Sequence, residues 1–154
     1  MVRVMTTMLC HGCFDVLHIG HVRFLTAAKG LGDHLIVSVT ADAFVTKGRG
    51  RPIFTAEERG EMLEALSVVD QVYIAYAASA LPIIEHLRPD LYVKGGDYVG
   101  GDVLGYLDEE RAAVEAYGGR LVILDVPPRY SSTALVNGSL LLARSQAHGC
   151  RQSV

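Results

Sequence analysis

The sequence lacks several features that mark particular classes of protein. Its net charge is only −3, so no strong positive field indicates a nucleic-acid partner. No apolar run approaches the ~20 residues of a membrane span. The first residues, MVRVMTTML, lack the apolar core and cleavage site of a signal peptide. Three cysteines, an odd number, do not make a disulfide framework. We therefore expect a cytoplasmic protein with no nucleic-acid or membrane partner.

The chain also lacks a Walker-type motif, an internal repeat and a low-complexity segment. Its 154 residues favour one domain, which we place at residues 1–144, followed by a tail at residues 145–154. Half of the residues are apolar, which is enough to build a sizeable core.

The most informative segment is CHGCFDVLHIGH, residues 10–21, in which His18 and His21 flank Gly20. A predicted strand precedes it at residues 7–10 and a predicted helix follows at residues 22–28. Both imidazoles therefore fall at a helix start, where free N–H groups and the helix dipole suit a phosphate. One histidine there is more often a cap or a surface residue. The pair with Gly20 instead favours two donors to a phosphate in a transition state.

Cys10 and Cys13 form a C-x-x-C motif within this segment. A redox dithiol needs its first cysteine exposed at a helix N-terminus, whereas Cys10 ends a predicted apolar strand. A haem-attachment site needs a histidine after the second cysteine, but Phe14 follows Cys13. No second C-x-x-C completes a zinc site. We expect buried or turn-lining cysteines and keep a redox or metal protein as an alternative class.

The rest of the sequence alternates strands and helices. Strands are predicted at residues 35–40, 71–75, 91–94 and 120–126, and helices after Thr55 and at residues 80–87, 108–117 and 131–143. This order predicts an α/β, three-layer Rossmann-like fold with a five-stranded parallel sheet. Ligands bind at the carboxyl ends of such strands. Because every candidate motif follows a strand, we expect one active-site cleft.

The loop TKGRGRP, residues 46–52, places three cations among glycines. Lys47 is the first candidate to neutralise developing phosphate charge, with Arg51 or Arg49 as alternatives. A solvated surface loop with ordinary charges is an equally good interpretation of the segment alone. Arg59, beside two glutamates on a predicted helix, is typical of a surface ion pair.

Two further segments follow the fourth and fifth predicted strands. In KGGDY, residues 94–98, the glycines allow close approach of a ligand. Asp97 could bind Mg²⁺ through a water molecule, accept a hydrogen bond from a substrate hydroxyl, or hydrogen-bond to its own backbone in a turn. In RYSST, residues 129–133, Arg129 and the hydroxyls at a helix start predict a second anion site or a simple cap.

Taken together, GCFDVLHIGH, ADAFVTKGRGRP, EERGEMLEALSVVDQV, LRPDLYVKGGDY and YSSTAL resemble the cytidylyltransferase-like nucleotidyltransferase superfamily. Within it, the chain is similar to the adenylyltransferase domain of bifunctional ADP-heptose synthesis enzymes and to glycerol-3-phosphate cytidylyltransferases. The segment PDLYVKGGDY favours the heptose branch.

The resemblance implies transfer of a nucleoside monophosphate from a nucleoside triphosphate, with ATP favoured over CTP, to a phosphorylated sugar or polyol. It also implies release of pyrophosphate, Mg²⁺ carried by the nucleotide and a homodimer. A CTP-dependent glycerol-3-phosphate cytidylyltransferase and a non-catalytic nucleotide-binding module are the alternatives.

The resemblance also assigns residues. It implies catalytic roles for His18, His21, Lys47 and Arg129. The implied nucleotide contacts are Gly12, Cys13, Phe14, Asp15, Gly20, Lys94, Gly95, Asp97, Ser131, Ser132 and Thr133. Acceptor or secondary roles are implied for Asp42, Arg51 and Arg59.

Overall fold

Five parallel strands form one sheet, which confirms the α/β fold predicted from the alternation of elements. The computed structural model describes residues 5–96, 105–126 and 132–136. The strands are β1 (Thr7–Gly12), β2 (His34–Thr40), β3 (Gln71–Ala75), β4 (Leu91–Gly95) and β5 (Arg120–Leu124). Their order across the sheet is β3-β2-β1-β4-β5.

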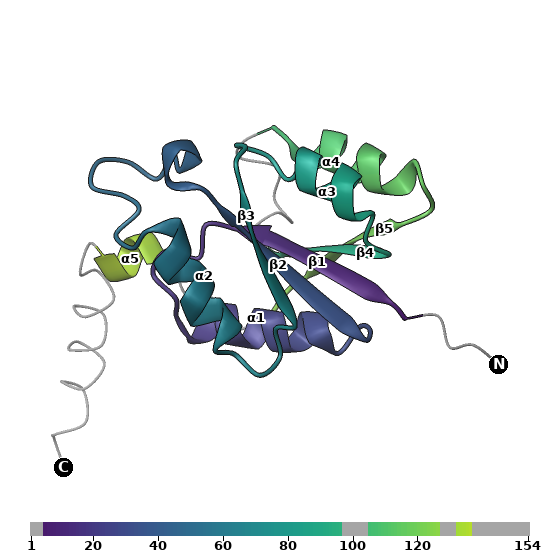
Figure 1. Ribbon diagram of the computed structural model, residues 1–154, viewed down its shortest axis with the longest axis horizontal. Coiled ribbons are helices and arrows are strands. Elements are labelled where there is room, and N and C mark those ends of the chain that lie inside the picture. The colour runs from purple at the N-terminus through teal and green to yellow at the C-terminus, as the bar shows by residue number, and fades with distance from the viewer. Residues whose placement is uncertain (1–4, 97–104, 127–131, 137–154) are drawn as a thin grey trace, which may run out of the picture.

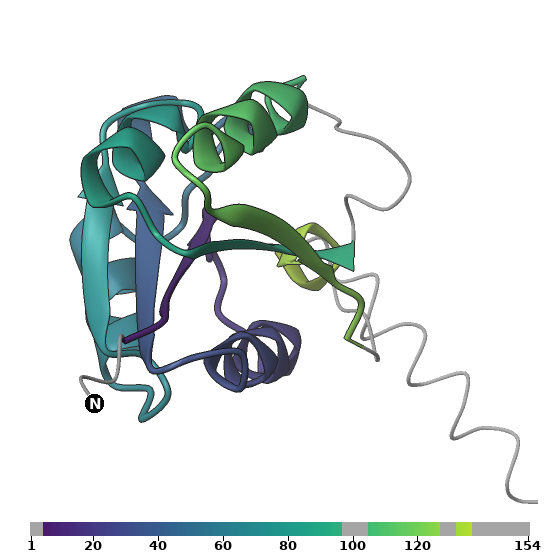
Figure 2. The ribbon, with the colours of Figure 1, turned by 90° about the vertical axis from the view of Figure 1, so that its right-hand side faces the viewer.

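Helices cover both faces of the sheet, as the three-layer prediction requires (Figures 1 and 2). One face carries α1 (Ile19–Lys29) and α2 (Ala56–Glu64), and the other carries α3 (Leu81–Leu87) and α4 (Leu107–Glu115). A short 3-10 helix, η1 (Asp42–Phe44), follows β2, and the described part of the chain ends in α5 (Ser132–Val136).

The direction in which strands are added reverses beside β1. The chain runs outward through β2 and β3 to one edge, then returns to β4 on the other side of β1. In open parallel sheets, ligands bind at the carboxyl ends of the strands next to this reversal. The turn after β1 leads into α1, whose start carries His18 and His21, so the topology places the histidine pair at this edge of the sheet.

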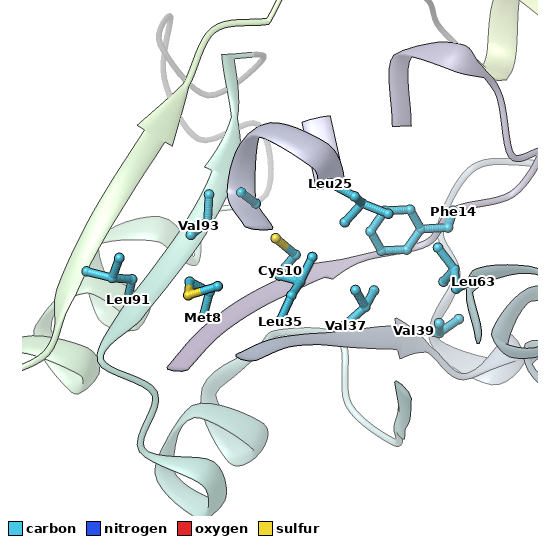
Figure 3. Packing of buried hydrophobic residues seen from close by; sticks show 11 residues of the cluster. Met8, Cys10, Phe14, Leu25, Leu35, Val37, Val39, Leu63, Leu91 and Val93 are labelled. Atoms are coloured by element: carbon cyan, nitrogen blue, oxygen red, sulfur yellow. The ribbon is translucent and has the colours of Figure 1, made fainter. Parts of the chain in front are cut away.

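The core consists of two apolar clusters because strand side chains alternate between the faces. Leu9, Ile36 and Tyr92 pack with Ile84 and Val114 beneath α3 and α4. The intervening strand residues pack under α1 and α2. Figure 3 shows the members of that cluster, which include Met8, Cys10, Phe14, Leu25, Leu35, Val37, Val39, Leu63, Leu91 and Val93.

β1 is two residues longer than the sequence predicts. Pairing with β2 continues through His11 and Gly12, because the backbone ladder does not depend on an apolar side chain. Cys10 therefore lies inside the strand and is fully buried, which confirms the expected burial. Burial raises the pKa of its thiol well above the usual range, so the nucleophilic thiolate that redox chemistry needs is disfavoured.

The structure contains the helices that the sequence predicts within the described residues, with some differences at their ends. A capping box starts the helix predicted after Thr55, since Glu58 N–H donates to Thr55 Oγ1 at 3.2 Å and Thr55 N–H donates to Glu58 Oε2 at 2.9 Å. α2 ends at Glu64, and Leu66 packs against the core from beyond the helix. α5 covers part of the predicted last helix. The remainder of that helix and the predicted boundary at residue 144 lie outside the described residues.

No helix within the described ranges combines the length and apolar character needed to cross a lipid bilayer.

Candidate active site

The start of α1 is capped by imidazoles. His18 is the N-cap residue, and its Nδ1 accepts a hydrogen bond from Gly20 N–H at 3.1 Å. His21 Nδ1 accepts from His18 N–H at 3.3 Å, which completes a reciprocal capping box. The two rings stack with centroids 3.8 Å apart. The structure thus confirms that both histidines lie at the helix start.

These hydrogen bonds determine which nitrogen of each ring is available. A neutral imidazole has one acceptor nitrogen and one N–H donor. Because Nδ1 accepts in both rings, the proton of the neutral form lies on Nε2. Burial lowers the pKa of His21 to about 3, and the nearby His18 and Lys47 contribute to this shift. At neutral pH His21 is therefore an uncharged ring that presents an Nε2–H donor.

Phe14 packs against His21 in the turn after β1. It is buried, has a positive φ of 50°, and meets His21 edge-on with ring centroids 5.3 Å apart. A Cβ at Gly12 would come within 3.1 Å of the Phe14 ring, so a larger residue at this point of β1 would require the phenyl group to shift by a few tenths of an ångström. Both residues, expected to contact nucleotide, thus help to shape the turn.

Lys47 brings two separated segments together. Its Nζ donates to Ser132 Oγ at 3.5 Å, which links the loop after β2 to α5. Ser132 is buried and Thr133 is exposed. The charge of Lys47 also contributes to the lowered pKa of His21, so this ammonium lies near the histidine pair. The predicted residues Asp97, Arg129 and Ser131 lie outside the described residues.

Asp15 and Arg51 form a buried ion pair. Their side chains are 0% and 4% exposed, and Arg51 Nε donates to Asp15 Oδ2 at 2.6 Å. The carboxylate also accepts from Ile53 N–H at 3.0 Å and Phe54 N–H at 3.1 Å. The pair therefore ties the glycine-rich loop to the turn after β1. Arg51, offered by the sequence as a substitute for Lys47, is held in this internal contact instead.

Arg59 is fully buried, so its interpretation as a surface ion pair is wrong. Its guanidinium donates to the carbonyl oxygens of Cys13 at 2.6 Å, Thr40 at 2.8 Å and Phe54 at 2.9 Å. It also donates to Asp42 Oδ1 at 2.6 Å. These partners come from the ends of β1 and β2 and from the loop before α2. Arg59 thereby fixes three segments around the site.

A pocket of about 230 Å³ lies at the carboxyl ends of the strands. It brings together four of the predicted site residues, Gly12, Cys13, Lys47 and Lys94. The other residues that line it are His11, Thr40, Phe44, Val45, Thr46, Ala78, Tyr106 and Glu110. Gly95, expected beside a ligand, ends β4, and a Cβ built there would meet no atom within 4 Å.

The described carboxylates around the site all have partners. Asp15 is paired with Arg51, Asp42 with Arg59, and Glu110 lies 3.6 Å from Lys94. Within the described ranges, no group of three or more His, Cys, Asp and Glu side chains could hold a metal ion.

Comparison with known proteins identifies the family. The family model described as Cytidylyltransferase-like matches residues 9–138. The chain belongs to the cytidylyltransferase-like family. It is 40% identical over 133 residues to the bifunctional protein HldE of Syntrophotalea carbinolica, covering 85% of this chain and 26% of that protein. It is 44% identical over 128 residues to HldE of Rhodopseudomonas palustris, covering 82% and 25%.

The chain thus spans about a quarter of the length of these curated relatives. Among solved structures, it matches the lipopolysaccharide core biosynthesis protein of Thermoplasma volcanium, with a TM-score of 0.65 and 26% identity. That match covers 83% of this chain and all of the other chain.

In this cytidylyltransferase-like chain, the eight other lining residues are not among the predicted site residues, and the buried Glu110 is the least expected of them. A glutamate in the first turn of α4 is typical of a surface acid that complements the helix dipole. Its spacing from the neighbouring apolar residues is the signal in the sequence that indicates burial. Leu107, Glu110 and Val114 share one helical face, and all three are buried.

The buried pair at Asp15 yields a prediction about acid stability. Burial alone would raise the pKa of Asp15, but hydrogen bonds from Ile53, Arg51 and Phe54 outweigh it and hold the pKa below its usual range. The unfolded chain therefore takes up a proton at a higher pH than the folded one. The stabilisation by Asp15 is complete above the unfolded pKa of about 4 and is lost as the pH falls through the lower folded-state pKa.

We expect Asp15→Asn to lower the free energy of unfolding by about 3 kcal/mol at pH 7, because Arg51 is left without its buried partner. The variant should also lose less stability than the unmodified protein between pH 5 and pH 3. Urea unfolding across this range measures both effects, with Asp108→Asn, whose side chain is 95% exposed, as the matched control. Parallel pH curves for Asp15→Asn and the unmodified protein would contradict the prediction.

Proposed function

We propose that this chain transfers an adenylyl group from ATP to a phosphorylated sugar and releases pyrophosphate. The observation that carries the proposal is the pair of imidazoles at the start of α1, which present Nε2–H donors beside Lys47. Membership of the cytidylyltransferase-like family supports nucleotidyl transfer. The similarity to HldE and to a lipopolysaccharide core biosynthesis protein supports a sugar phosphate as acceptor.

The proposed reaction needs no protein nucleophile. An oxygen of the acceptor phosphate attacks the α-phosphorus of the nucleotide and forms a new P–O bond. The bond from the α-phosphorus to the oxygen that bridges it to the β-phosphorus breaks, and pyrophosphate leaves with that electron pair. Because the acceptor is already an anion, catalysis consists of positioning and of stabilising charge on the phosphates.

The described residues supply that stabilisation in two forms. His18 and His21 would donate from Nε2 to phosphate oxygens, and the neutral His21 would do so without giving up its proton. The N-terminus of α1 adds the positive end of its dipole. Lys47 adds a full positive charge beside the pair. Arg129 and Ser131 are proposed to extend the site toward the leaving pyrophosphate.

Mg²⁺ is proposed to enter with the triphosphate as part of the substrate. Asp15, Asp42 and Glu110 are each already paired with a cationic side chain, which supports a metal ion carried by the nucleotide. When bound, the ion would neutralise phosphate charge. We also propose a homodimer, on the resemblance alone.

The substrate assignment is tested by pyrophosphate release. ATP and CTP are each combined with heptose 1-phosphate, hexose 1-phosphates and glycerol 3-phosphate. We expect ATP with a sugar 1-phosphate to exceed every other pair by more than about tenfold in kcat/KM, since a site that pairs one base leaves buried groups unpaired with another. Turnover of CTP with glycerol 3-phosphate alone would overturn the substrates but keep the chemistry. Tight nucleotide binding without turnover would favour a binding module.

The role of the histidines is tested by substitution. We expect His18→Ala and His21→Ala each to lower kcat by about 10²–10³, as for the loss of a transition-state donor. His18→Ala also removes a helix cap, so His18→Asn serves as the matched variant, because asparagine is a good N-cap. Kcat should fall in His18→Asn although its melting temperature stays near normal. Near-normal kcat in the variants of both histidines would contradict the assignment.

A further inference from the structure

One edge of the sheet is open. β3 is the outermost strand, and within the described residues no strand pairs with its outer side (Figure 2). On its inner side, Ala41 N–H donates to Ala75 C=O at 2.9 Å. Because backbone groups alternate in direction along a strand, those of Val72 and Ile74 point outward, away from β2. Outward N–H and C=O groups on an edge strand are a template for pairing with another strand.

β3 has none of the devices that usually keep an edge from pairing. Natural edge strands carry charged side chains, a proline or a bulge. This strand reads QVYIA and keeps an unbroken register with β2. The uncharged character continues beyond it, since residues 71–84 contain no Asp, Glu, Lys, Arg or His. The edge is therefore competent to pair.

A groove of about 340 Å³ lies beside the end of this edge and is lined mostly by apolar side chains. Ile74 and Tyr76 border it from the strand, and Pro82 and Ile83 border it from α3. Tyr76 is 74% exposed, the highest value among the exposed large apolar residues of the described ranges. Exposed apolar surface that gathers in one place is typical of a contact site. Backbone pairing and apolar contact are thus available side by side.

The lack of charge favours a second copy of this chain as the partner. In a two-fold interface the same patch meets itself, so a charged strand would bring like charges together. β3 and the groove contain no Asp, Glu, Lys or Arg. Asp70, the residue before the strand, is already paired with Lys29 at 2.5 Å. Self-association therefore meets no repulsion along this edge, and interfaces between identical chains are more apolar than other protein surfaces.

We propose that β3 is the contact between two copies of this chain, which pair their β3 strands antiparallel across a two-fold axis and cover Tyr76 and the groove. The two five-stranded sheets then form one continuous sheet. β1 lies at the centre of each sheet, so the histidine pair that follows it belongs wholly to one copy. The proposal gives a surface to the homodimer inferred from the resemblance, and it does not depend on the reaction.

Two variants test the contact. Tyr76→Glu replaces an exposed apolar ring and puts two negative charges into the two-fold interface. Ile74→Pro removes one outward N–H from each strand, and proline is tolerated on an edge strand where the N–H points to solvent. Leu31→Glu is the matched control, because this 38% exposed leucine follows α1 and belongs to neither β3 nor α3.

Sedimentation velocity at micromolar concentrations measures the association. We expect the unmodified protein to sediment with about twice the chain mass of 16.6 kDa. Tyr76→Glu and Ile74→Pro should each raise the dissociation constant at least about hundredfold, because each change occurs twice in the dimer, while Leu31→Glu stays within about twofold. If Ile74→Pro does not unfold cooperatively, Tyr76→Glu decides.

Amide hydrogen exchange tests strand pairing itself. The N–H groups of Val72 and Ile74 should exchange slowly in the unmodified dimer and rapidly in Tyr76→Glu, because pairing protects them only when the partner is present. Rapid exchange of both amides in the unmodified dimer would overturn the paired strands.

A mass of one chain at every concentration would overturn both the contact and the homodimer. A dimer that persists in Tyr76→Glu would overturn the contact at β3 and leave the homodimer standing. Pyrophosphate release is measured on the same samples, and its absence would contradict the proposed reaction without bearing on the contact.

Discussion

The site depends on how the first turn of α1 satisfies its backbone N–H groups. Most helices use a serine, threonine or acidic side chain for this purpose. Here the acceptors are Nδ1 atoms of His18 and His21. Because an imidazole has a second nitrogen, the same hydrogen bonds that start the helix also orient each ring and set its tautomer. The helix start and the donors of the proposed active site are therefore one structure, and a change in either changes both.

Buried charged groups hold the surrounding segments around this helix start. The Asp15–Arg51 pair joins the turn after β1 to the glycine-rich loop, and Arg59 joins the ends of β1 and β2 to the loop before α2. Buried charges carry a large desolvation cost unless they are paired and hydrogen-bonded. Here each has several partners, so the loop that carries Lys47 is anchored at its far end by specific contacts.

The sequence predicted those features that depend on local patterns. The strand–turn–helix order, the histidines at the helix start and the helix after Thr55 follow from periodicity and capping, which act over a few residues. The sequence does not predict the burial of Arg59, because this depends on carbonyl groups of Cys13 and Thr40, which only the tertiary fold brings near. The contact of Lys47 with Ser132 and the position of Glu110 in the pocket wall also depend on the tertiary fold, so local patterns do not predict them.

The tautomer of the histidine pair tests this account most directly. Nitrogen-15 chemical shifts of the imidazole rings distinguish Nδ1–H, Nε2–H and doubly protonated forms, and single substitutions at His18 and His21 assign the signals. The account predicts that Nε2 carries the proton of the neutral ring in both residues, with His21 remaining neutral until the pH approaches about 3. An Nδ1–H form of either ring, or titration of His21 near pH 6.5, would contradict it.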